Sequence, residues 1–366
     1  NDNTQQVEFS SVRFFSFSHS KTTTTTVMTT TAATTMMSIP RIVSVNTMTF
    51  LVLWIAFSIS SGSVTAFTSI GVVPFSSSTT TAGMMKQQQQ QKSTLYATDD
   101  NTDGFATAAR TISDAAASLR GQTIVVKYGG NAMTSPELKA GFCEDVATLQ
   151  NLGIRVVVVH GGGPQINAML EKVGVESRFE GGMRVSSKDV VDVAEMVLCG
   201  SVNKEISSTI CSAGGRALGL SGRDDSLLQC VKKQNKDGYD LGFVGEVDVV
   251  NTKLLNDLLQ QGICPVVSPI GTGMGDEKDV AYNVNADVAA GRIAGELRAA
   301  RVLFLTDIAG VLDKEMKLLP TLSCDDVDSL IDDETITGGM IPKVSYATSA
   351  VKLGVGGAFI TDGRVP

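Results

Sequence analysis

From about residue 103 onward, apolar runs of strand length alternate with segments of helical spacing. The strand-like runs cover 123–133, 154–163, 216–224, 263–273, 301–313 and 355–366. The helix-like segments cover 103–122, 136–153, 164–174, 188–215, 252–262, 283–299 and 337–354. Strands that are apolar throughout and alternate with helices are typical of a parallel sheet covered on both faces. The pattern predicts an α/β fold, a three-layer α/β/α sandwich around an open, mainly parallel sheet.

Two segments depart from this alternation. Residues 177–187 predict a hairpin or flap, and residues 227–250 predict a β-hairpin with an Asp237-Gly238 turn. Several helices have clear ends: Gly121 and Gly153 stop two of them, and Pro164 starts a third.

Residues 1–102 do not continue the pattern and are interpreted as a presequence followed by a disordered linker that includes Gln87–Gln91. The chain begins at Asn1, so part of it is upstream sequence if Met28, Met36, Met37 or Met48 is the true start. Residues 37–66 are expected to be a secretory signal peptide, because the apolar run Phe50–Phe57 is too short to span a membrane and ends in small residues. A short membrane anchor is the alternative.

The segment from Phe67 to about Thr98 is rich in Ser, Thr and Gln, and its only charged residues are Lys86 and Lys92. A signal peptide followed by such a segment with Phe at the junction resembles the bipartite plastid-targeting presequences of algae with secondary plastids. That resemblance implies import into the chloroplast stroma and no membrane association of the mature form.

Composition excludes several classes of function. The formal net charge of −8 argues against a nucleic-acid binder. The six cysteines are scattered without a CxxC pair, which indicates reduced core thiols rather than a metal cage or disulfide frame. With only His19 and His160, a histidine-based metal site or catalytic triad is not expected.

Three glycine loops follow predicted strands: Gly129-Gly130, Gly161-Gly162-Gly163, and Gly271, Gly273 and Gly275. In a parallel sheet such loops gather at the carboxyl ends of the strands, where ligands bind. Glycine lets backbone N–H groups approach an anion, and a following helix adds a favourable dipole. A single loop is as well explained by a tight turn, but three together predict a phosphate or carboxylate site.

Known nucleotide fingerprints are absent from the sequence. It contains no GxxxxGK[ST] motif, no GxGxxG spacing and no GxSxG elbow beside HGGG. Lysines are the remaining candidates for phosphate chemistry. Lys127 lies inside an apolar strand, where burial is costly without an anionic partner, and Lys343 follows the loop TGGMIP. The alternative for both is a surface lysine.

Six motifs together resemble the N-acetylglutamate kinases of the amino-acid kinase family. They are KYGGNAM (127–133), VVVHGGGPQIN (157–167), GMRVS (182–186), NVNADVAAG (283–291), LTDIAGVLD (305–313) and GGMIPKV (338–344). The resemblance runs from about Phe105 to Pro366. It implies transfer of the ATP γ-phosphoryl group to the side-chain carboxylate of N-acetyl-L-glutamate, the second step of the acetylated arginine and ornithine route.

The resemblance also implies roles for particular residues. Lys127 and Lys343 would stabilise the moving phosphoryl group, and Asp287 would hold both ammonium groups. Gly162, Gly163, Arg184 and Asn283 would bind the acceptor. ATP with Mg²⁺, the metal held mainly by the nucleotide phosphates and not by a protein site, would bind at Gly129, Gly130, Thr306, Asp307, Gly310, Val311, Leu312, Thr335, Ile336 and Thr337.

For several of these residues a structural role is the alternative to the functional one. Arg184 could be a surface charge of the hairpin, and Asn283 and Asp287 could be a cap and a solvated acid on one helix face. His160 is expected to be structural, since a carboxylate acceptor needs no base. At the level of the whole protein, the rivals are a glutamate kinase of the same fold, a silent sensor of arginine or another metabolite, and a dehydrogenase.

The resemblance further predicts two lobes, regulation and assembly. Residues 103–282 would form the N-terminal helix and the acceptor lobe, and residues 283–366 the nucleotide lobe, with the C-terminus truncated. A helix before the first strand, here Phe105–Leu119, is found in relatives that L-arginine inhibits and that form hexamers as trimers of dimers. Binding of the signalling protein PII is a further possibility of plastid relatives.

Overall fold

The computed structural model describes residues 102–364, except residue 134 and residues 235–238. The predicted presequence, linker and Asp237-Gly238 turn lie outside the described residues. The helices are α2 Thr102–Leu119, α3 Pro136–Asn151, α4 Gly163–Val173, α5 Lys188–Glu195, α6 Asn203–Ser212, α7 Lys253–Gln260, α8 Ala286–Glu296, α9 Cys324–Asp332 and α10 Met340–Lys352. None of these described helices is both long and apolar enough to cross a membrane.

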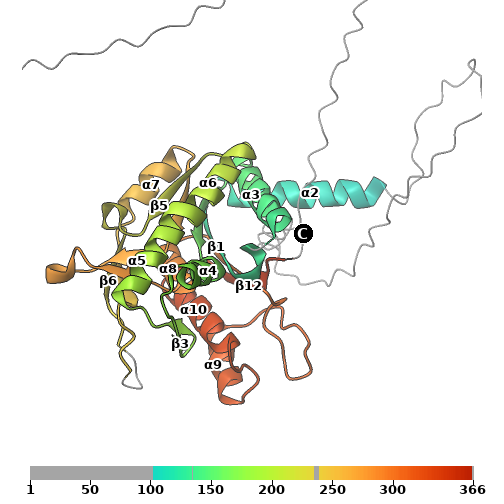
Figure 1. Cartoon of the computed structure of the whole chain (residues 1–366). Coiled ribbons are helices and arrows are strands. Elements are labelled where there is room, and N and C mark those ends of the chain that lie inside the picture. The colour runs from blue at the N-terminus through green and yellow to red at the C-terminus, as the bar shows by residue number, and fades with distance from the viewer. Residues whose placement is uncertain (1–101, 134, 235–238, 365–366) are drawn as a thin grey trace, which may run out of the picture. The chain divides into compact units, whose positions relative to one another are not determined.

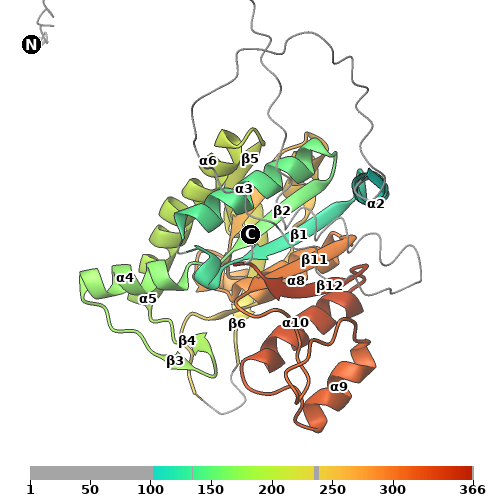
Figure 2. The same cartoon turned by 90° about the vertical axis from the view of Figure 1, so that its right-hand side faces the viewer.

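The strands are β1 Thr123–Tyr128, β2 Arg155–His160, β3 Phe179–Glu180, β4 Met183–Arg184, β5 Ala217–Ser221, β6 Leu228–Lys232, β7 Gly245–Val250, β8 Cys264–Ser268, β9 Ile270–Thr272, β10 Ala281–Asn283, β11 Arg301–Thr306 and β12 Ala358–Asp362. Six of them form the central sheet in the order β12-β11-β1-β2-β8-β5. Each neighbouring pair is parallel. Figure 2 shows these strands fanning side by side. The sheet continues across the predicted lobe boundary, because β11 and β12 pair beside β1.

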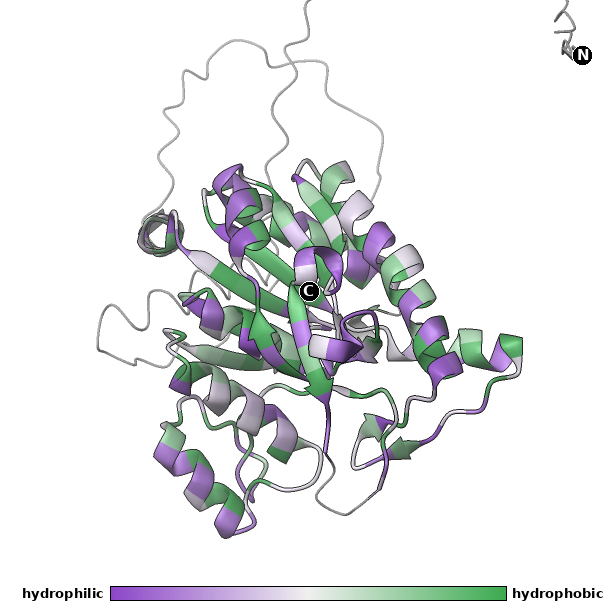
Figure 3. Ribbon diagram, turned by 90° about the vertical axis from the view of Figure 1, so that its left-hand side faces the viewer, coloured by the Kyte–Doolittle hydropathy of each residue, from purple (hydrophilic) through white to green (hydrophobic). Residues whose placement is uncertain are grey.

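Helices cover both faces of the sheet, as predicted. Alternate residues of a strand point to opposite faces, so Val126 and Val158 pack with α3, α4, α5 and α6 on one side. Val125 and Val157 pack with α7, α8 and α10 on the other. The central strands are accordingly mainly hydrophobic, whereas the helices alternate between hydrophobic and hydrophilic residues (Figure 3). The three-layer α/β/α prediction is confirmed.

A smaller sheet, in the order β10-β9-β6-β7, lies beside the central one. Strands β6 and β7 pair antiparallel, which confirms the predicted hairpin. The third glycine loop belongs here, because Gly271 lies within β9, so the prediction that it gathers with the other two loops at the carboxyl edge of the central sheet is wrong. A Cβ added to Gly271 would lie 2.3 Å from Cys230 Sγ, and one added to Gly273 would lie 2.2 Å from Glu277 O. These glycines serve close packing of the smaller sheet.

The segment 188–215 forms one continuous helical run, as predicted, but it contains a π-helical stretch, Met196–Val202, between α5 and α6. Helix α9 was not predicted. Its signal is present in the sequence, because Ser323 and Asp326 form a capping box at its start. Figure 1 shows α9 and α10 next to each other below the sheet.

Candidate active site

Two glycine loops meet where β1 and β2 end. These strands are adjacent and in register, with Tyr128 opposite His160. The N–H of Gly161 donates to the carbonyl of Tyr128 at 2.8 Å. A Cβ on Gly129 would lie 3.5 Å from the nitrogen of Gly161. Gly130 has a φ of +70°, which favours glycine. The structure therefore brings the first two predicted loops together at the carboxyl edge of the sheet.

Lys127 projects from β1 to this edge and pairs with an acid from α8. Its Nζ lies 3.1 Å from Asp287 Oδ1, and the two side chains are 13% and 17% exposed. Asp287 lies in the first turn of α8, where the helix dipole favours a negative charge. Burial of the lysine is thus matched by an anionic partner, as the sequence required.

Asn283 and Asp287 do not share a helix face, so the alternative interpretation of the two as a cap and a solvated acid on one helix is wrong. Asn283 ends β10, and α8 begins only at Ala286 because the Asn285 side chain caps it, accepting from the N–H groups of Asp287 and Val288. Asn283 Nδ2 instead donates to Ser186 Oγ at 3.1 Å. The predicted solvated cap and acid are therefore two separately anchored groups.

Lys343 reaches the site from the first turn of α10. Its Nζ donates to Thr306 Oγ1 at 2.6 Å and lies 3.7 Å from Asp307 Oδ1. The end of β11 thus supplies these contacts of Lys343, whereas Asp287 contacts Lys127, and the role of Asp287 in holding both ammonium groups stays a prediction. A hydrogen bond from its own backbone, helped by Thr306 and Lys343, lowers the pKa of Asp307.

Arg184 is a buried member of the β3–β4 hairpin, not a surface charge. Its side chain is held on one side by Ser177, with Nη1 to Oγ at 2.8 Å. On the other, Nη2 donates to Asn167 Oδ1 at 2.6 Å. The guanidinium also lies 4.6 Å from the centre of the Phe179 ring. These contacts tie the flap to α4, directly behind the second glycine loop.

The second glycine loop is shaped by the π-helical stretch. A Cβ on Gly162 would lie 2.5 Å from Leu198 Cδ2, so only glycine lets that helix pass so closely. Gly163 begins α4, and its carbonyl lies 3.5 Å from Arg184 Nη2. A π-helical turn is often found at functional sites. No sequence pattern predicted this π-helical stretch.

His160 is fully buried and structural in its contacts, as expected. Its Nδ1 donates to the carbonyl of Gly161 at 2.8 Å, and its Nε2 accepts from Asn203 Nδ2 at 3.1 Å. Burial lowers the pKa of His160 to about 4, so the ring is neutral at physiological pH. Asn203 also donates to Val266 O at 2.7 Å. This partner of His160 was missed because it lies 43 residues away in the sequence.

Most of the predicted nucleotide residues lie beyond β11, whereas Gly129 and Gly130 follow β1. Val311 and Ile336 are buried together with Val344, the neighbour of Lys343. Leu312 forms an isolated β-bridge with Leu318. A Cβ added to Gly310 would lie 2.7 Å from Leu318 Cδ1, so Leu318 also packs closely against Gly310. Thr335 donates its N–H to Asp333 Oδ1, and the Thr337 carbonyl accepts from the N–H of Met340 at the start of α10.

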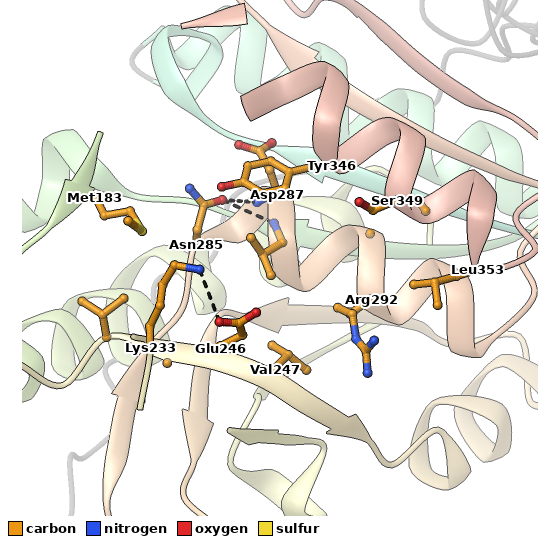
Figure 4. Close-up of a pocket in the computed structure, with 15 residues that line it drawn as sticks. Met183, Lys233, Glu246, Val247, Asn285, Asp287, Arg292, Tyr346, Ser349 and Leu353 are labelled. Carbon is orange, nitrogen blue, oxygen red and sulfur yellow. Dashed lines mark hydrogen bonds and ion pairs between the residues drawn. The ribbon is translucent and has the colours of Figure 1, made fainter. Parts of the chain in front are cut away.

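A pocket of about 400 Å³ opens beside Asp287, between β7, α8 and α10. Figure 4 shows Asn285, Asp287 and Tyr346 at one end, with Lys233, Glu246 and Arg292 along its length. Burial raises the pKa of Tyr346, and the charge of Asp287 adds to this. Tyr346 was not predicted, although it lies three residues after Lys343 on the same helix.

Residues 122–362 match the amino acid kinase family model, and the chain belongs to this family. Its curated relatives include acetylglutamate kinases. That of Neisseria meningitidis serogroup C is 48% identical over 274 residues, covering 73% of this chain and 91% of the relative. That of Rhodospirillum centenum is 49% identical over 270 residues, covering 70% and 88%. The predicted family and fold are confirmed.

A solved structure is similar in fold. N-acetylglutamate synthase from Neisseria gonorrhoeae, complexed with coenzyme A and N-acetyl-glutamate, has a TM-score of 0.61 at 24% identity. The match covers 72% of this chain and 59% of that chain, so this chain spans well under two thirds of the synthase. At this identity the likeness shows the fold alone.

Proposed function

We propose that this chain transfers the γ-phosphoryl group of ATP to the side-chain carboxylate of N-acetyl-L-glutamate, giving N-acetyl-L-glutamyl 5-phosphate and ADP. The observation that carries the proposal is the presence of two lysines, each with its own acid, at one edge of a sheet: Lys127 with Asp287 and Lys343 with Asp307. Identity of 48% to an acetylglutamate kinase supports the named acceptor.

The chemistry needs little covalent help from the protein. A carboxylate is already a nucleophile at neutral pH, so no general base is required. The enzyme has to hold the acceptor and γ-phosphate in line and to neutralise charge on the moving group. Two ammonium groups and the N–H groups of the glycine loops are suited to that task. The neutral, fully engaged His160 takes no part in proton transfer.

Acceptor binding is assigned to the flap and the second glycine loop. Arg184 presents a planar, pre-oriented guanidinium, which suits the α-carboxylate of the acceptor. Asn283 is joined to the flap through Ser186, whose Oγ donates to the Arg184 carbonyl at 2.9 Å. This hydrogen bond places the two proposed acceptor-binding groups on elements that contact each other. Gly162 and Gly163 offer backbone N–H groups beside them.

Nucleotide binding is assigned to the loop after β11 and to the segment before α10. The carboxylates nearest the lysines, Asp287 and Asp307, are each paired with an ammonium group. We therefore assign Mg²⁺ mainly to the nucleotide phosphates, so that it enters as part of the ATP complex. Thr306 and Asp307 hold Lys343 at this end of the sheet, and Val311 and Ile336 are buried together beyond it.

Regulation and assembly are proposed on a narrower basis. Helix α2 precedes β1, and its last turn buries Ala115 and Leu119 against the core. The Neisseria gonorrhoeae synthase has also been solved with coenzyme A and L-arginine, with a TM-score of 0.58 at 23% identity. We propose feedback inhibition by L-arginine, a hexamer and binding of PII. Import into the plastid is proposed from the presequence.

The activity is tested by coupled ADP release from the purified chain with N-acetylglutamate, glutamate, aspartate or carbamate as acceptor. We expect turnover with N-acetylglutamate alone. Turnover with glutamate would replace the named acceptor, and absence of turnover with any acceptor would favour a metabolite sensor. L-Arginine titration and sedimentation analysis of the same sample then test feedback and assembly.

A further inference from the structure

The turn that follows β12 grips the end of β11 at two successive carbonyl groups. In the sheet, Asp362 is the register partner of Thr306. The N–H of Gly363 donates to the Thr306 carbonyl at 2.9 Å. Arg364 Nη2 donates to the Asp307 carbonyl at 2.6 Å. The backbone that leaves β11 is therefore fixed by residues 57 positions later in the sequence.

Arg364 is itself held in one orientation by Asp362. Its Nε lies 2.9 Å from Asp362 Oδ1 and its Nη2 lies 2.8 Å from Asp362 Oδ2. This is the bidentate arrangement in which the planar guanidinium adds directional precision to its charge. The backbone N–H of Arg364 also donates to Asp362 Oδ1, at 2.9 Å. These hydrogen bonds to Arg364 lower the pKa of Asp362, so the pair is ionised at neutral pH.

The same two residues whose carbonyls are gripped also hold Lys343 through their side chains. Thr306 Oγ1 accepts from Lys343 Nζ, and Asp307 Oδ1 lies 3.7 Å from it. Residues 307–310 form a bend without helix or strand pairing. Contacts from outside the loop must therefore fix where its side chains point.

We propose that Arg364 is a positioning residue that sets the place of the Lys343 ammonium group through the backbone of Asp307, with Asp362 orienting Arg364. This inference rests on the proposed function, in which Lys343 stabilises the moving phosphoryl group. Arg364 need not touch substrate. It keeps the loop, and hence the Thr306 and Asp307 acceptors, at the distance that phosphoryl transfer requires.

The expected kinetic signature is a loss in kcat rather than in acceptor binding. A displacement of about 1 Å at a reacting group can lower a rate about 10²-fold. We expect Arg364→Ala to lower kcat roughly 10- to 100-fold while KM for N-acetylglutamate changes less than about threefold. Arg364→Lys keeps the charge but loses the fork, so its kcat should lie between those of wild type and Arg364→Ala.

Two measurements separate positioning from a loss of fold. Millimolar guanidinium added to Arg364→Ala should restore part of kcat, because the free ion can occupy the place of the missing fork. In a double-mutant cycle, Arg364→Ala should have little effect when Lys343→Ala is already present. The matched control is Arg155→Ala, an exposed arginine at the start of β2, which should leave kcat unchanged.

The outcomes are distinguishable from failure of the proposed function. If Lys343→Ala keeps full kcat, the assigned role of that lysine fails. If Lys343→Ala is inactive but Arg364→Ala matches Arg155→Ala, only the positioning inference is overturned. A loss of kcat in Arg364→Ala that guanidinium does not restore and that adds in full to Lys343→Ala also overturns it, since that is the behaviour of a merely structural residue.

Discussion

The two lysines of the site carry the same charge but reach it from contrasting surroundings. Lys127 lies within a buried strand, 13% exposed, and faces an acid on a capped helix. Lys343 is 28% exposed and depends on a hydroxyl and a half-exposed carboxylate at the end of a strand. The first arrangement is fixed by the core, whereas the second is fixed by loop contacts. The site thus has a rigid side, formed by Lys127 and Asp287, and an adjustable side, formed by Lys343, Thr306 and Asp307.

The largest effect on activity should come from a substitution on the rigid side. Lys127→Ala removes one of the two ammonium groups and leaves Asp287 without its partner, and we expect kcat to fall about 10³-fold, the upper range for loss of one stabilising donor. Lys188→Ala is the control, since Lys188 is an exposed helix residue that pairs with Asp192. Steady-state kinetics of both variants decide the matter. Equal kcat values in the two variants would contradict the assignment of Lys127.

Lower pH should reduce the stability of the folded chain through His160. Its folded-state pKa is depressed to about 4 from an ordinary value of 6.5. Between these two pKa values His160 is protonated in the unfolded chain but not in the folded chain. The free energy of unfolding therefore falls as pH drops from 6.5 towards 4. One pKa unit corresponds to about 1.4 kcal/mol, so the loss amounts to roughly 3 kcal/mol.

The measurement is the free energy of unfolding of wild type and His160→Gln between pH 7 and pH 4.5. The difference between them should shrink as pH falls, because only wild type loses the histidine contribution. Parallel pH curves would show that His160 does not titrate between the folded and unfolded states.

Substitution at the flap should affect acceptor binding more than chemistry. Arg184→Lys loses the fork that bonds Ser177 and Asn167, and we expect KM for N-acetylglutamate to rise about tenfold or more. KM for ATP should stay near that of wild type. Arg178→Lys, in the same segment and with a side chain 69% exposed, is the matched control. A rise in KM for ATP alone would place Arg184 on the nucleotide side instead.

The smallest effect should come from the loss of a single contact of Lys343. Thr306→Val removes the hydroxyl that bonds Lys343, a contact to a charged group worth about 1.5 kcal/mol. Because Asp307 still attracts the ammonium, kcat should fall no more than about tenfold. Thr306→Ser restores the hydroxyl and should recover most of the activity. A loss as large as that of Lys127→Ala would erase the contrast between the two sides.

By itself, the sequence determined the architecture of the central sheet and its chemistry. Strands that are apolar on both faces are buried on both faces, here between two layers of helices. A lysine inside such a strand needs an anionic partner to offset the cost of burying its charge. The glycine loops after β1 and β2, of two and three residues, predicted a ligand site at that edge of the sheet. These signals are local, so the spacing of a few residues is enough to display them.

Only the tertiary structure decided which partners meet. Lys343 pairs with the end of β11 instead of Asp287, Asn283 anchors to Ser186 instead of lying on a helix, and the third glycine loop belongs to another sheet. Asn203, Arg364 and the π-helical stretch gave no sequence signal. Each of these depends on contacts between residues far apart along the chain. Strand order and helix packing bring such residues together, and no local pattern records that choice.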